Sequence, residues 1–83
     1  FPNPVTTGIL QLDYELKKTS PVTIELLTVS GKKVTTLFTG TQASGKQLVV
    51  WNRKNNSLPS GIYFIRMQVE NKTIIEKIIL GAN

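Results

Sequence analysis

Apolar and polar residues alternate one by one along much of this chain. Segment 10–16 is the clearest case, because its leucine and tyrosine side chains are separated by polar ones. A period of two places alternate side chains on opposite faces of a β-strand, so that one face can be buried. The pattern returns at 22–26 and at 62–69. No window carries a sustained period of 3.6 residues, so the sequence predicts an all-β fold.

Turn-forming residues separate these segments. Ser30-Gly31-Lys32 predicts a tight turn, Pro59-Ser60-Gly61 interrupts the chain before the next strand, and Asn71-Lys72 predicts a two-residue turn. The small polar residues 40–46 predict a loop. Further strands are expected at 33–38, 48–51 and 73–80. Short strands at this spacing most simply form an immunoglobulin-like antiparallel β-sandwich of about seven strands.

Composition excludes several kinds of chemistry. A chain of 83 residues predicts a single domain over 1–83. It contains no Cys and no His, which excludes zinc sites of the usual kind, thiol nucleophiles and histidine acid–base catalysis. Asp13 and Glu15 are neighbours on one strand face, whereas a glycosidase pair must flank its substrate across a gap. We therefore expect no enzyme, no catalytic residue, no metal and no cofactor.

The net charge of +5 is spread over the chain, and aromatic residues are not interleaved with the basic ones. We therefore expect no nucleic-acid partner. No apolar run approaches the length of about 18 residues that a transmembrane segment needs, so none is expected. The chain begins at Phe1 without Met, and we interpret it as a fragment of a larger secreted precursor. We expect a monomer.

Short motifs occur in a fixed order from one end of the chain to the other. They comprise a Pro-Asn-Pro opening, a glycine before the first strand, a glycine followed by lysines, a strand ending in Trp, a Gly-x-Tyr pair and a lysine-bearing last strand. In order, these residues are Pro2, Asn3, Pro4, Gly8, Gly31, Trp51, Gly61, Tyr63, Lys77, Ile78 and Ile79. The ordered set resembles the type A C-terminal sorting domain of proteins exported by the type IX secretion system of Bacteroidetes.

The resemblance implies a non-catalytic signal that directs a cargo protein across the outer membrane, with the cargo N-terminal in the same precursor. The implied partners are the outer-membrane type IX translocon and a surface protease that removes the domain. The implied location is the periplasm in transit and then the cell surface or the medium. We expect recognition at Gly61, Tyr63, Lys77, Ile78 and Ile79. We expect the structural motif positions to be Pro2, Asn3, Pro4, Gly8, Gly31 and Trp51.

The last strand has apolar residues on both faces, so its register stays open. If Ile75 and Ile79 face inward, Lys77 shares their face. In the other register Ile74, Ile78 and Leu80 face inward, and Glu76 is the polar residue among them. In either register a lysine in a terminal strand suits docking by strand addition, or protection of a sheet edge.

Two other functions are compatible with a small β-sandwich. One is a carbohydrate-binding or spacer module attached to a glycoside hydrolase or adhesin, for which Trp51 is the best candidate for stacking on a sugar. Its apolar neighbours predict burial instead. The other is an assembly module of the flagellar-hook-cap type, which would oligomerise.

Overall fold

The structure is a computed structural model, and it describes residues 9–52 and 58–81. Within these ranges it contains six strands and no helix. In chain order they are β1 (Ile9–Leu16), β2 (Ser20–Leu27), β3 (Lys33–Gln42), β4 (Gly45–Asn52), β5 (Gly61–Val69) and β6 (Lys72–Leu80). The all-β prediction is confirmed.

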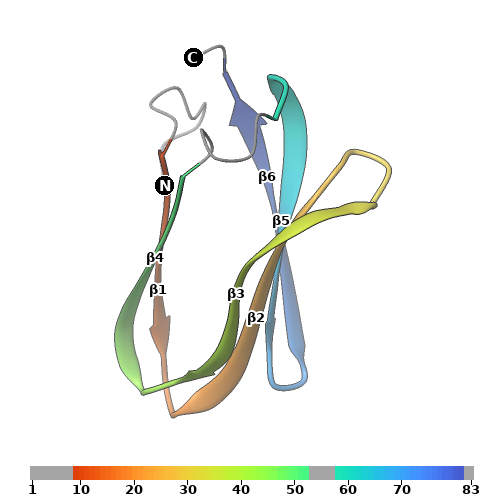
Figure 1. Cartoon of the computed structure of the whole chain (residues 1–83). Coiled ribbons are helices and arrows are strands. Elements are labelled where there is room, and N and C mark those ends of the chain that lie inside the picture. The colour runs from red at the N-terminus through yellow and green to blue at the C-terminus, as the bar shows by residue number, and fades with distance from the viewer. Residues whose placement is uncertain (1–8, 53–57, 82–83) are drawn as a thin grey trace.

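The strands form two antiparallel sheets. In the part of the chain that the structure describes, one sheet contains only β1 and β4, and the other has the order β3-β2-β5-β6. Figure 1 shows the two sheets as separate layers, connected at one end where β1 leads into β2 and β3 leads into β4. The arrangement is sandwich-like and consistent with the expected immunoglobulin-like fold. About seven strands were expected, and the described residues form six.

β1 and β4 pair along their whole length because each presents apolar residues to the same interior. Leu10, Leu12 and Leu16 of β1 are at most 7% exposed, as the period of two predicted. In register, Leu12 lies opposite Val49 and Leu10 opposite Trp51. Their neighbours on the other face remain in solvent, so each strand of this sheet is buried on one side only.

The centre of the core lies on β2. Val22, Ile24 and Leu26 alternate along it and are at most 1% exposed. β2 is flanked by β3 and β5, so its apolar face has neighbours on both sides. Burying one such aliphatic side chain contributes about 1.5–3 kcal/mol. The central strand therefore supplies much of the stability of a domain this small.

Two boundaries differ from the sequence prediction. The expected loop at 40–46 is mostly strand, because β3 continues to Gln42 and β4 starts at Gly45. Pairing with the neighbouring strand explains this difference, because Gln42 pairs with Ser20 across the sheet. Such pairing can hold small polar residues in a strand even where their composition predicts a loop. The last turn lies one residue earlier than expected. Lys72 already belongs to β6, and Glu70 adopts the positive φ of 54° that the turn requires.

The register of β6 is the second of the two considered from the sequence. Ile78 and Leu80 are buried at 0% and 1% exposure, and they pack into the core. Ile75 and Ile79 are exposed, and Lys77 lies between them on the outer face. Lys77 is therefore not buried among apolar neighbours, and the register that would have required this is wrong.

Candidate functional site

The five predicted recognition residues lie together at one end of the β5–β6 hairpin. Gly61 lies opposite Leu80, Tyr63 opposite Ile78, and Ile79 opposite Ile62. Lys77 pairs with Phe64, the next position along. Residues from the two motifs, which lie in consecutive strands, are thus neighbours in the sheet.

The sheet divides these residues between its two faces. Tyr63 and Ile78 point into the core, with exposures of 7% and 0%. Lys77 and Ile79 lie on the outer face, where a partner could touch them. The two buried residues can contribute to recognition only by supporting the strands, whereas the two outer residues can make contacts.

The Gly-x-Tyr motif has a local structural explanation. Gly61 has φ of +150°, and a β-carbon placed there would meet no atom within 4 Å. Glycine is therefore required by the backbone conformation rather than by lack of space. Two residues later, the hydroxyl of Tyr63 donates a hydrogen bond of 2.8 Å to the carbonyl oxygen of Pro59. The motif fixes the entry of the chain into β5.

The outer face of this hairpin carries an apolar surface that the sequence motifs indicate only in part. We call it the outer patch and define it as Ile62, Phe64, Ile75, Lys77 and Ile79. Its isoleucines are 37–59% exposed. Ile62, Phe64 and Ile75 were not among the predicted recognition residues. The available signal was the presence of apolar residues on both faces of 62–65 and 74–80, where a half-buried sheet needs them on one face only.

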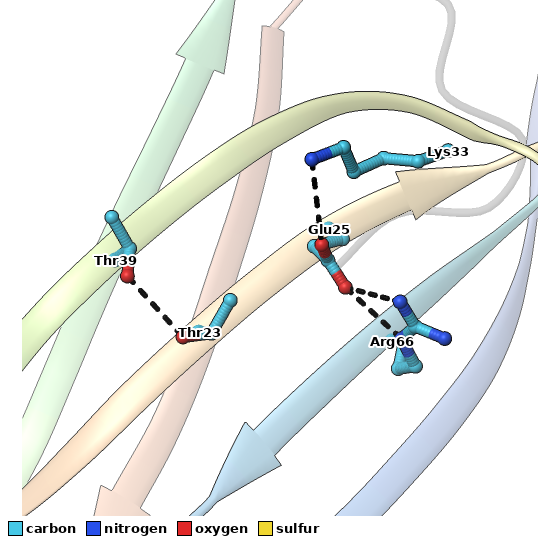
Figure 2. A network of polar contacts seen from close by, with 5 residues as sticks. All are labelled: Thr23, Glu25, Lys33, Thr39 and Arg66. Carbon is cyan, nitrogen blue, oxygen red and sulfur yellow. Dashed lines mark hydrogen bonds and ion pairs between the residues drawn. The ribbon is translucent and has the colours of Figure 1, made fainter.

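A polar cluster adjoins the outer patch, because Arg66 is the cross-strand partner of Ile75. Figure 2 shows the side chains of this cluster. Glu25 on β2 accepts two hydrogen bonds from Arg66 on β5, at 3.0 Å from Nε and 2.5 Å from Nη2. Lys33 lies 3.9 Å from the other carboxylate oxygen. Glu25 is the least exposed of the three, with 13% of its side chain accessible. The cluster compensates the charge of Arg66, and no ion pair engages Lys77 in the described part of the chain.

Gly31 and Trp51 have structural roles of different kinds. Gly31 closes the turn after β2 with φ of +91°, and its amide donates a 2.9 Å hydrogen bond to the carbonyl of Thr28. Trp51 is partly buried against the core from β4. A sugar-stacking platform needs an aromatic face in solvent, so Trp51 gives the carbohydrate alternative no support. Pro2, Asn3, Pro4 and Gly8 lie outside the described residues.

Chemical groups with catalytic potential are scarce. Within residues 9–52 and 58–81, no three His, Cys, Asp or Glu side chains gather as metal ligands would. Burial raises the pKa of the Tyr14 phenol, and a hydrogen bond to Gln42 opposes part of that change. No helix in these ranges is long and apolar enough to cross a membrane.

Comparison with known families decides among the candidate functions. Residues 1–81 match the family described as the secretion system C-terminal sorting domain. The chain belongs to this family. Among curated proteins, no sequence matches this chain. The sorting domain is a non-catalytic signal of type IX secretion, and its presence implies a cargo precursor that is exported to the cell surface or secreted.

Proposed function

We propose that this sorting domain takes its cargo from the periplasm through the outer-membrane type IX translocon and is then removed by a surface protease. The family match over 1–81 is the observation that carries the proposal. The arrangement of the β5–β6 hairpin supports it, because the residues predicted to be recognised meet there beside an exposed apolar surface.

The outer patch is the surface that the translocon reads in this proposal. Its isoleucines would lose solvent contact on docking, and each buried methylene contributes about 0.8 kcal/mol. Lys77 would pair with a receptor carboxylate, which adds selectivity to an otherwise apolar contact. Among the described strands β6 is the last of the four-stranded sheet, so strand addition along its 72–76 end is a second way to engage the same receptor.

The experiment is an export assay. Residues 1–83 are placed behind a signal peptide, a fluorescent reporter and a native upstream linker, and expressed in a bacterium competent for type IX secretion. A strain without the translocon is the control. The proposal predicts reporter at the surface or in the medium of the competent strain alone, shortened by about the mass of the domain. Reporter retained in the periplasm of both strains, with the domain folded, would contradict it.

A further inference from the structure

As far as the described strands go, the two sheets differ in width, and these strands leave part of the inner face of β6 uncovered. Ile78 and Leu80 at one end of β6 are fully buried, but Ile74 on the same face is 46% exposed. Ile74 pairs with Met67 of β5, which is itself only half-buried. No strand among the described residues covers this end of β6, because the opposite sheet consists of β1 and β4 alone.

A groove occupies this uncovered region, between β1 and the start of β6. We call it the side groove and define it by Tyr14, Leu16, Met67, Val69 and Ile74. Its volume is about 360 Å³ and its lining is mainly apolar. A second hollow of about 170 Å³ continues it past Leu12 and Ile65 toward Glu76. The side groove lies on the inner face of the hairpin, opposite to the outer patch.

Both walls of the side groove are strand edges. In the described part of the chain β1 pairs only with β4, and β6 pairs only with β5. Beside the groove, the other edge of β1 over Leu12–Leu16 and the other edge of β6 over 72–76 present main-chain amide and carbonyl groups. A strand added to β1 would widen the narrower sheet and cover Ile74, whereas a strand added to β6 would widen the sheet that is already wider. The geometry therefore favours addition to β1.

The two ends of the side groove differ in charge. At its mouth, Lys18 pairs with Glu70 at 3.5 Å, and Glu15 lies opposite Lys46 in the β1–β4 register. Two further lysines at the mouth, Lys17 and Lys72, form no ion pair within the described residues. Glu76 lies at the far end. An acidic group is thus favoured at the mouth and disfavoured at the far end.

We propose that the side groove binds an extended peptide from a partner protein, which pairs with β1 and places an acidic residue beside Lys17 and Lys72. Alternate apolar side chains of the peptide cover Met67 and Ile74. Residues Leu12–Leu16 of β1 offer about five positions at about 3.4 Å each, so a segment of about five to seven residues fits. A small polar ligand is less suited, because no buried side-chain polar atom in the described ranges lacks a hydrogen-bond partner.

The test uses the ¹⁵N-labelled 83-residue chain and the probe peptide acetyl-Glu-Glu-Val-Thr-Val-Thr-Val-amide, followed by NMR titration. The expected result is a shift of amides in β1 and β6 around the groove. A peptide with lysines in place of both glutamates should bind at least about tenfold more weakly, which equals about 1.4 kcal/mol. A peptide with proline at the central valine should lose binding, since proline removes a main-chain donor and restricts strand pairing.

Adjacent residues of β6 provide matched variants. Ile74→Asp alters the side groove, whereas Ile75→Asp alters the opposite face at a residue of similar exposure, 59% against 46%. We expect at least about tenfold weaker peptide binding for the first, and a change within about twofold for the second. Lys72→Glu should weaken binding, while Lys32→Glu in the turn after β2 should not. Circular dichroism confirms that each variant is folded.

Three results would overturn the inference. The first is that no amide around the groove changes its chemical shift at peptide concentrations up to about 1 mM, which would place the Kd above about 1 mM. The second is an equal effect of Ile74→Asp and Ile75→Asp. The third is a dimer in sedimentation equilibrium that Ile74→Asp dissociates, because the groove would then belong to a second copy of this chain. None of these results depends on export, so the sorting proposal stands or fails separately.

Discussion

The hydroxyl of Tyr63 donates a hydrogen bond of 2.8 Å to the main-chain carbonyl of Pro59, four residues before it. The tyrosine ring is buried at the start of β5, while its hydroxyl reaches back over the turn that leads into the strand. Gly61 lies between the two partners with φ of +150°. The Gly-x-Tyr motif thus supplies both the glycine that this backbone conformation needs and the tyrosine whose hydrogen bond holds the turn.

Tyr63→Phe tests this hydrogen bond with little change in packing. We expect the free energy of unfolding to fall by about 0.5–1.5 kcal/mol, the usual net contribution of one such bond. Urea denaturation followed by circular dichroism measures it. An unchanged denaturation midpoint would show that the hydroxyl contributes nothing to stability.

Gly61→Ala tests the backbone requirement. The added methyl group meets no atom within 4 Å, so any loss comes from the strained φ. We expect a loss of about 1–3 kcal/mol. The matched control is a synthetic chain with D-alanine at the same position, which accepts this φ and should keep nearly full stability. Equal losses from both forms of alanine would contradict the backbone explanation.

The ion pair between Glu25 and Arg66 should stabilise the four-stranded sheet from its outer face. Glu25→Gln keeps the shape but removes the charge that binds Arg66 through two hydrogen bonds. Because 35% of Arg66 is exposed, we expect a loss of only about 1 kcal/mol. Lys33→Ala is the control. Its 3.9 Å contact is largely in solvent, so it should change the free energy of unfolding by less than about 0.5 kcal/mol. Equal losses from both variants would count against a special role for Arg66.

Alkaline pH should reveal the burial of Tyr14. Burial raises the pKa of its phenol above the value in the unfolded chain, because the charged form loses solvation. The contribution of the neutral phenol to the free energy of unfolding is fully present below the unfolded pKa of about 10. It is lost as the pH rises through the folded pKa. The measurement is the free energy of unfolding above about pH 9, compared between the natural chain and Tyr14→Phe. The free energy of unfolding should decline less steeply with pH for Tyr14→Phe than for the natural chain. Parallel curves for the two chains would contradict the prediction.

The sequence predicted β1, β2 and most of β5 well, because their apolar residues alternate on one face. It left the register of β6 open because Ile74, Ile75, Ile78 and Ile79 supply apolar side chains to both faces. The choice depends on which of them meet the opposite sheet, a non-local property. The outer patch became visible only once β5 and β6 were paired. The side groove depends on strand order and on the unequal widths of the sheets, which alternation alone does not encode.

Export of paired surface variants tests the central claim most directly, namely that the outer patch of this sorting domain is read by the type IX translocon. Ile75 lies in the outer patch and is 59% exposed, and Val50 lies on the outer face of the other sheet and is 54% exposed. The two variants are Ile75→Asp and Val50→Asp. Both are made in the reporter fusion, and both domains are shown to be folded by circular dichroism. We predict that Ile75→Asp leaves the reporter in the periplasm, while Val50→Asp is exported like the natural chain. Equal export of the two folded variants would contradict the account.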